Sequence, residues 1–200
     1  MSAKTILPRR ATADKPPPLT PGRRKPHRSY RTYIHRLVDG AKFSCQAMAV
    51  LNSMADDLEC QIGCAASDLA RRDGRVTVLA HCIRTVAILI VGDDIVKQAG
   101  VTAQGVDCTR DINVMPVGRL HRFLKEKHGA KRASMDAAYA LGAIMSTLLR
   151  KIIESAANMA IAQKKVRIIP QFIQQAIADL DESGTRTLAD ALRGSIAAGG

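Results

Sequence analysis

The feature that most constrains the fold of this chain is an internal repeat of its apolar side chains. A shift of 90 residues along the chain superposes Leu51 on Leu141 and Leu58 on Leu148. Within each copy the apolar positions recur every three or four residues, which is the spacing of one stripe along a helix. The pattern predicts two related all-α units, with almost no strand beyond two-residue segments in the loops.

Each copy predicts a long helix of roughly 28 residues between two shorter ones. In the first copy the long helix stops at Asp73-Gly74, and in the second copy Pro170 opens the last short helix. The other predicted helices cover residues 29–38, 78–90, 116–127 and 134–163.

One copy cannot close a core by itself. A helix of this length extends about 42 Å, while its flanking helices are about half as long, so a long apolar stripe stays uncovered. We therefore predict that the two copies pack head to tail with their long helices crossing. Both copies lie on one chain, joined by a connector at residues 106–115, so the expected product is an intramolecular pseudo-dimer with a shared core.

Charge is concentrated at the start of the chain. Residues 1–28 hold eight basic side chains against one acidic one, together with six of the eight prolines. This composition predicts a disordered basic arm, and the simpler alternative is a solubilising tail. The net charge of +12 favours a polyanionic partner, nucleic acid before an anionic membrane surface. No uncharged run is long enough for a transmembrane helix, and the basic N-terminus lacks the apolar stretch that a secretory signal needs.

Three motifs of the second copy are highly specific, and they resemble the first helix, first loop and second loop of the 2A-type core histone. The resemblance runs from about Asn113 to the C-terminus. The motifs are Met115-Pro116-Val117-Gly118-Arg119-Leu120-His121-Arg122, Ala130-Lys131-Arg132 and Lys164-Lys165-Val166-Arg167-Ile168-Ile169-Pro170.

The first copy resembles the 2B-type histone more loosely, from about Arg24 to Gly105. Its matching segments are Arg28-Ser29-Tyr30-Arg31-Thr32-Tyr33-Ile34, Gln46-Ala47-Met48-Ala49-Val50-Leu51-Asn52-Ser53 and Arg75-Val76-Thr77. A fused 2B–2A chain resembles the histone doublets of giant viruses. The resemblance implies two tandem histone folds in a handshake, a 2B-like fold over residues 29–105 and a 2A-like fold over residues 116–200.

The resemblance also implies a function. A core histone doublet would wrap double-stranded DNA without sequence specificity in nucleosome-like particles. Its partner would be a histone 3/4-type pair or doublet, with two copies of each per particle. It would act in a chromatin-like setting (a virion, and a viral factory or host nucleus) and would not be secreted. The alternative is a histone-fold subunit of a sequence-selective transcription regulator, for which the sequence offers no reading element.

The DNA-binding residues are carried over from the resemblance. Arginines for the minor groove would be Arg75, Arg132 and Arg167, and contacts to the DNA backbone would come from Arg119 and Arg122. One such arginine alone is more often a solvated surface charge, but equivalent loop positions in both repeats favour DNA contact. The remaining expected contacts are Thr77 to a phosphate, Lys164 and Lys165 beside Arg167, and, where the arm leaves between the DNA gyres, Arg23, Arg24, Lys25 and Arg28.

The chain departs from the histone pattern in several places. Val166 replaces a threonine, so one hydroxyl contact to DNA is expected to be missing. The acidic patch of the 2A–2B surface is expected to be reduced, because Lys151 and Ser146 replace glutamates and Thr102 falls at another acidic position. Its remaining members are Asp94, Glu154, Asp181 and Glu182. The sequence ends at Gly199-Gly200, where the family continues, so we expect a truncated C-terminus.

Other chemistry finds little support. Cys60 and Cys64 are four residues apart on a helix and are more simply buried or semi-buried small residues than zinc ligands. His121 and His128 lack an accompanying carboxylate or nucleophile, and Gly92-Asp93-Asp94 is typical of a helix break and cap. We expect no catalytic residues, metal, cofactor or small-molecule substrate. Five cysteines without a C-x-x-C pair predict reduced thiols in a cytosolic or nuclear-type compartment.

Overall fold

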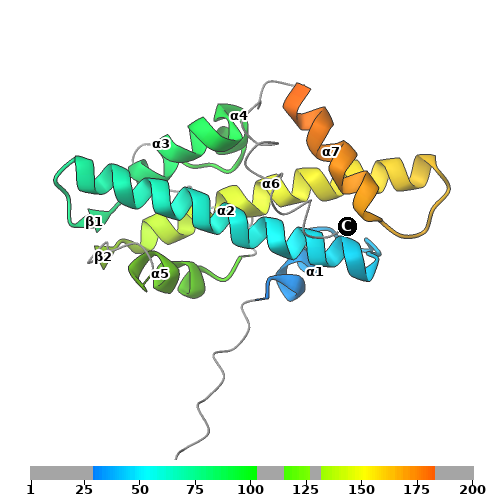
Figure 1. Ribbon diagram of the computed structural model, residues 1–200, viewed down its shortest axis with the longest axis horizontal. Coiled ribbons are helices and arrows are strands. Elements are labelled where there is room, and N and C mark those ends of the chain that lie inside the picture. The colour runs from blue at the N-terminus through cyan, green and yellow to red at the C-terminus, as the bar shows by residue number, and fades with distance from the viewer. Residues whose placement is uncertain (1–28, 103–114, 127–131, 183–200) are drawn as a thin grey trace, which may run out of the picture.

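The computed structural model of the chain describes residues 29–102, 115–126 and 132–182. The predicted basic arm and most of the predicted connector lie outside these residues. Figure 1 shows the elements in order, and their bounds are α1 (Arg31–Leu37), α2 (Cys45–Arg72), β1 (Thr77–Val78), α3 (Ala80–Val91), α4 (Asp93–Gln98), α5 (Val117–Glu126), β2 (Arg132–Ala133), α6 (Met135–Ala162) and α7 (Pro170–Glu182).

The two long helices, α2 and α6, have the predicted length of 28 residues each. Both begin after a serine whose hydroxyl accepts a hydrogen bond from a backbone amide of the first turn. The distance is 3.1 Å from the amide of Ala47 to Ser44 and 3.1 Å from that of Ala137 to Ser134. These caps satisfy amides that the helix itself leaves unpaired. The repeat thus extends from the apolar stripe to the helix start.

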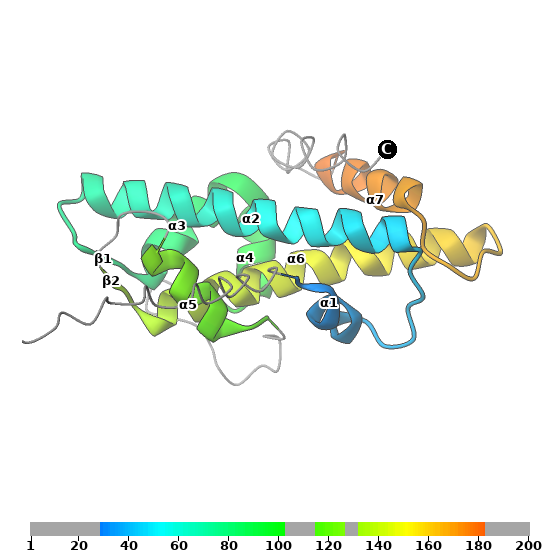
Figure 2. The ribbon, with the colours of Figure 1, turned by 60° about the horizontal axis from the view of Figure 1, so that its bottom comes forward.

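The short helices of each half contact the long helix of the other half. Helix α3 packs on both α2 and α6, and α7 packs on both α6 and α2. In the same way α1 contacts α6 and α5 contacts α2. Figures 1 and 2 show α2 and α6 crossing the molecule together with the short helices around them. Neither half has a core of its own.

The core is centred on α6. Residues 141–149 of this helix are all buried, whereas buried positions of α2 alternate with half-buried or exposed ones. Leu58 and Ile62 of α2 are fully buried with Leu141 and Ile152 of α6.

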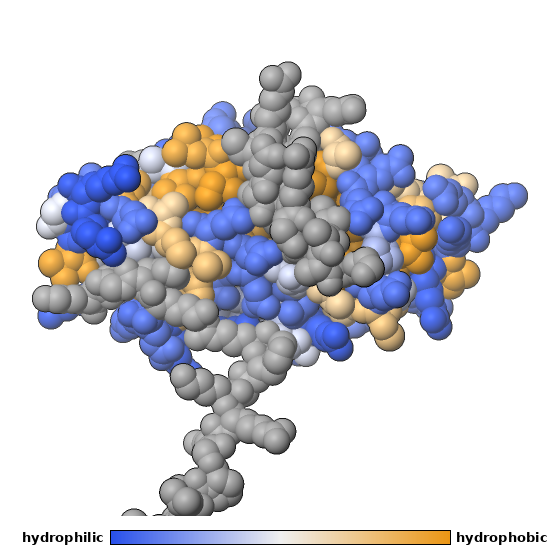
Figure 3. All heavy atoms as spheres, viewed as in Figure 1, coloured by the Kyte–Doolittle hydropathy of each residue, from blue (hydrophilic) through white to orange (hydrophobic). Residues whose placement is uncertain are grey.

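Apolar residues also gather on the surface over α3, where Leu89 is 70% exposed (Figure 3).

The loops pair across the two halves. Strands β1 and β2 are parallel, with Thr77 opposite Arg132 and Val78 opposite Ala133. At the other end Phe43 forms a parallel bridge with Ile168, whose amide donates to the Lys42 carbonyl at 2.8 Å. The second loop of each half therefore meets the first loop of the other. This is the predicted head-to-tail arrangement, and it is confirmed.

One helix was not predicted. The expected break at Gly92 is present, because this residue ends α3 with a φ of 89° that favours glycine. The chain then forms the short helix α4, in which Lys97 Nζ lies 2.6 Å from Asp93 Oδ2. Among the residues that the structure describes, none of the helices has the length and apolar character needed to cross a bilayer.

Candidate nucleic-acid interface

The first basic end of the molecule combines the second loop of the first half with the first loop of the second half. Arg75 and Arg132 are exposed, and Thr77 is half-buried. The parallel register places Thr77 opposite Arg132 although the two are far apart in sequence. The turn after α2 is closed by Gly74, at a φ of 68°, and by a hydrogen bond of 2.9 Å from the Arg75 amide to the Ala70 carbonyl. We call this group of residues the β-pair end.

The second basic end, which we call the bridge end, combines the loop after α6 with the first loop of the first half. Lys164, Lys165 and Arg167 are all exposed there. The turn repeats that of the β-pair end, because the Lys165 amide donates to the Ala160 carbonyl at 2.8 Å. Val166, which replaces the expected threonine, is 75% exposed.

Lys42 is a basic residue of the bridge end that the sequence analysis missed. It is exposed, and its carbonyl accepts from the Ile168 amide beside Arg167. The signal was present in the repeat, because Lys42 occupies the position that Arg132 occupies one repeat later. Each end therefore has basic residues from both halves. Figure 1 shows the two ends at opposite extremes of the elongated molecule.

The two arginines of α5 differ in their surroundings. Arg122 is exposed, as a backbone contact to DNA requires. The Arg119 side chain is only 20% exposed, and its guanidinium carbon lies 4.0 Å from the centre of the Tyr30 ring. Their predicted contacts with DNA stay predictions, as do those of Arg23, Arg24, Lys25 and Arg28, which lie outside the described residues.

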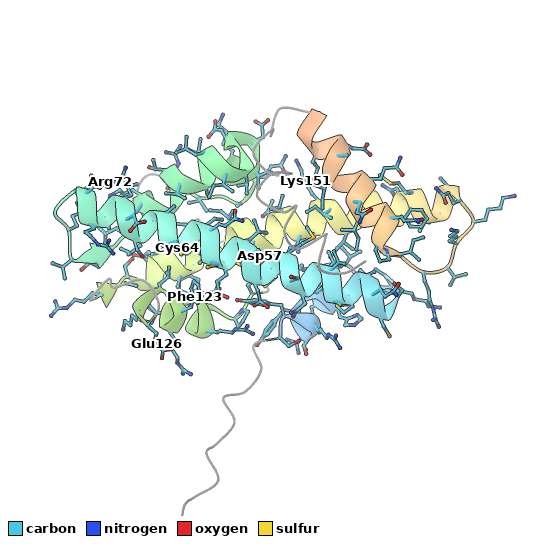
Figure 4. The ribbon with its side chains drawn as sticks, in the orientation of Figure 1. Asp57, Cys64, Arg72, Phe123, Glu126 and Lys151 are labelled. Atoms are coloured by element: carbon cyan, nitrogen blue, oxygen red, sulfur yellow. The ribbon has the colours of Figure 1, made fainter. Side chains whose placement is uncertain are left out.

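The residues expected at a reduced acidic patch are distributed over three helices. Asp94 of α4 and Glu154 of α6 are exposed, and these two helices are in contact. Asp181 and Glu182 close α7. Ser146 is fully buried in α6, so this replacement for a glutamate does not reach the surface, while Lys151 is half-buried. Figure 4 shows where Lys151 lies on α6.

The remaining candidate residues have local roles. His121 Nε2 lies 2.9 Å from the Ala133 carbonyl, which links α5 to β2. His128 lies outside the described residues. Cys60 is exposed, contrary to the expectation of burial, and its Sγ lies 3.8 Å from that of half-buried Cys64. Two thiols are half of the four ligands that structural zinc takes. Within the described ranges no group of three or more potential ligands is arranged around a metal position.

Comparisons with known proteins agree with this geometry. Residues 97–178 match the family model of the core histone domain, which covers the 2A, 2B, 3 and 4 types of histone. The structure is also similar to the crystal structure of the histone from Methanopyrus kandleri, with a TM-score of 0.60 and 17% sequence identity. That similarity covers 82% of this chain and 99% of the other, so it includes both halves.

The fold is the histone fold, and the chain is a histone-fold protein. More particularly, it is similar to a core histone domain over residues 97–178. The 2B-like identity of the first half, the 2A-like identity of the second half and the giant-virus type remain predictions.

Proposed function

We propose that this chain is a core histone doublet that binds and wraps double-stranded DNA without sequence specificity in nucleosome-like particles. The observation that carries the proposal is the pairing of loops at both ends of the molecule. At the β-pair end, Thr77 pairs with Arg132 in the loop that also carries Arg75. At the bridge end, the loop that carries Lys164, Lys165 and Arg167 pairs with the loop of Lys42 through Ile168 and Phe43. The core histone match of residues 97–178 supports the same function.

The DNA phosphates are the groups that the two basic ends would bind. Exposed lysines and arginines bind the phosphate backbone without reading sequence, and arginines enter the minor groove where it faces the protein. Two basic ends at opposite extremes of one rigid body would hold successive stretches of the same duplex. A duplex that contacts both ends and the basic helix α5 between them has to bend around the protein. The net charge of +12 supplies the attraction.

The finer parts of the proposal follow the histone resemblance. The partner would be a histone 3/4-type pair or doublet, two copies of each assembling with two copies of this chain. The genome compacted would be viral, in a virion and in a viral factory or host nucleus. We propose a purely architectural role without catalysis.

Nuclease digestion tests the proposal. DNA of mixed sequence is assembled with this chain, with and without a histone 3/4-type partner, and digested. Wrapping predicts protected fragments of fixed length at many positions, and naked DNA treated in parallel should give none. A footprint confined to one sequence would instead support the transcription-regulator alternative. Uniform digestion in both assemblies would contradict the proposed function.

A further inference from the structure

A polar cluster joins the two halves next to the basic N-terminal segment. Arg119 of α5 lies over the Tyr30 ring, and its Nη1 donates to the Ser29 carbonyl at 3.1 Å. Its Nη2 lies 3.6 Å from Asp56 Oδ1 on α2. One side chain of the second half thus contacts three residues of the first.

The hydroxyl, the backbone amide and the backbone carbonyl of Tyr30 all form hydrogen bonds. The residue is fully buried, and its hydroxyl donates to Glu59 Oε2 at 2.8 Å. Its amide donates to Asn52 Oδ1 at 2.6 Å. Its carbonyl accepts from the amides of Tyr33 and Ile34, both at 2.9 Å, and so begins α1. The position of Tyr30 therefore determines where α1 starts and where residues 1–28 join the fold.

The Arg119 side chain packs over the Tyr30 ring. Its planar guanidinium stacks on the ring while its nitrogens reach a carbonyl and a carboxylate, a combination that a lysine ammonium cannot reproduce. The Asp56 carboxylate offsets the positive charge that a DNA phosphate would need. Arg122, on the next turn of the same helix, is exposed to solvent instead.

We propose that Arg119 is a positioning residue that fixes Ser29 and Tyr30, the residues directly after the basic arm, against α5. We further propose that Arg119 does not itself bind a phosphate. The inference rests on the proposed DNA-binding function. Arg28 is covalently next to Ser29, and Arg23, Arg24 and Lys25 precede it by a few residues. Fixing Ser29 against α5 would therefore limit how far the chain can carry these cations from that helix. A tether this short raises the local concentration of these cations at the DNA.

Hydrogen exchange without DNA tests the anchor. In R119K the charge remains, while the stacking on Tyr30 and the planar guanidinium that donates to the Ser29 carbonyl and pairs with Asp56 are lost. Losing a hydrogen bond to a charged group should make the amides of Tyr33 and Ile34 exchange about tenfold faster. The control R122K, on the same helix, should leave their exchange unchanged. Circular dichroism checks that both variants keep their helices. Unchanged exchange of these amides in R119K would overturn the anchor.

DNA-binding measurements test whether Arg119 itself contacts a phosphate. Each lost phosphate contact lowers the slope of log K against log salt by ~0.9. We expect that fall in R122A, and in R119A an unchanged slope with severalfold weaker binding. In the full chain with Arg23, Arg24, Lys25 and Arg28 all changed to alanine, R119A should weaken binding no further.

A fall of ~0.9 in R119A that persists in this neutralised background would make Arg119 a phosphate contact and overturn the proposal. If the unaltered chain binds no DNA at any salt concentration, the proposed function fails, and the exchange experiment still decides whether Arg119 anchors Tyr30. The two failures are therefore distinguishable.

Discussion

Lys164, a predicted DNA contact, has a backbone conformation that costs stability. Among the described residues, Lys164 is the one residue other than glycine with a positive φ, and its φ is 54°. Its counterpart one repeat earlier is Gly74, which adopts a φ of 68° without strain. A left-handed residue with a Cβ costs about 1–2 kcal/mol, and such strain is common at functional positions.

We predict that K164G stabilises the fold and weakens DNA binding. Relief of strain exceeds the entropy that glycine adds to the unfolded chain, so the free energy of unfolding should rise by up to about 1 kcal/mol. The salt slope of DNA binding should fall by ~0.9 because one cation is lost. Urea denaturation and a salt titration measure the two effects. In the reverse change, G74K, the added Cβ has no atom within 4 Å, so the positive φ of the backbone should destabilise the variant. A K164G variant less stable than the unaltered chain would contradict the strain argument.

The three loop arginines should act as phosphate contacts. Changing Arg75, Arg132 and Arg167 to alanine together should lower the salt slope by between two and three, at ~0.9 for each contact. The affinity should fall equally on unrelated DNA sequences, since phosphate contacts carry no base information. Titrations on two duplexes at several salt concentrations measure both. A loss restricted to one duplex would argue against this role.

Tyr30 should make the fold sensitive to alkaline pH. Burial, with the negative charge of Glu59 beside it, raises the pKa of Tyr30 above its usual value near 10. The unfolded chain then ionises first, so this contribution to stability is full below pH 10 and is lost as the pH rises above it. In Y30F the unfolding free energy should be about 1.5–3 kcal/mol lower at neutral pH, because Glu59 loses a donor. The Y30F variant should also lose the part of the alkaline decline in stability that comes from ionisation of Tyr30. The control Y139F, at an exposed tyrosine, should retain it.

At the scale of elements, the contact between α2 and α5 depends on a glycine. A Cβ at Gly63 would lie 2.9 Å from Cε1 of Phe123 and 3.4 Å from Cδ2 of Leu124, both buried in the core. Figure 4 shows Phe123 on the side of α5 toward α2. The absence of a side chain at residue 63 lets the two halves approach closely here.

We predict that G63A destabilises the fold although alanine favours helices. Overpacking costs about 1–3 kcal/mol and the gain in helix propensity returns at most about 1 kcal/mol. The matched control is G118A on α5, where nothing lies within 4 Å of the added Cβ, and it should be neutral or stabilising. Denaturant unfolding of both variants measures the difference. Equal stability of G63A and G118A would mean that α2 and α5 are less tightly packed than this geometry indicates.

At the scale of the whole molecule, each half depends on the other. The contacts between the short helices of one half and the long helix of the other are made within one chain. Folding should therefore be a single cooperative transition of a monomer, with no bimolecular step.

We predict a melting midpoint that does not depend on protein concentration. Calorimetry over a hundredfold range of concentration should give the same midpoint, whereas two separate histone-fold chains that must associate would melt higher when concentrated. A midpoint that rises steeply with concentration would show that the halves pair between chains. Sedimentation of the same samples supplies an independent measure of mass.

The sequence by itself determined the two long helices, most of the short ones and several helix ends, although not α4. The apolar spacing predicted α2 and α6, Asp73-Gly74 and Pro170 marked helix ends, and the repeat predicted that two halves share one core. Helix formation depends on side chains three or four residues apart and on caps at the ends, so these features are encoded locally. The basic loop residues were predicted from the histone resemblance, and their equivalent positions in both copies favoured that prediction.

The tertiary structure alone decided which side chains meet. It placed Lys42 beside Arg167, buried Ser146, and brought Arg119 to the carbonyl of Ser29, 90 residues earlier. The exposure and charge balance of a side chain depend on the segment that packs over it, and here that segment comes from the other half. No local pattern contains that information, because the crossing of α2 and α6 brings these residues together only once the whole core has formed.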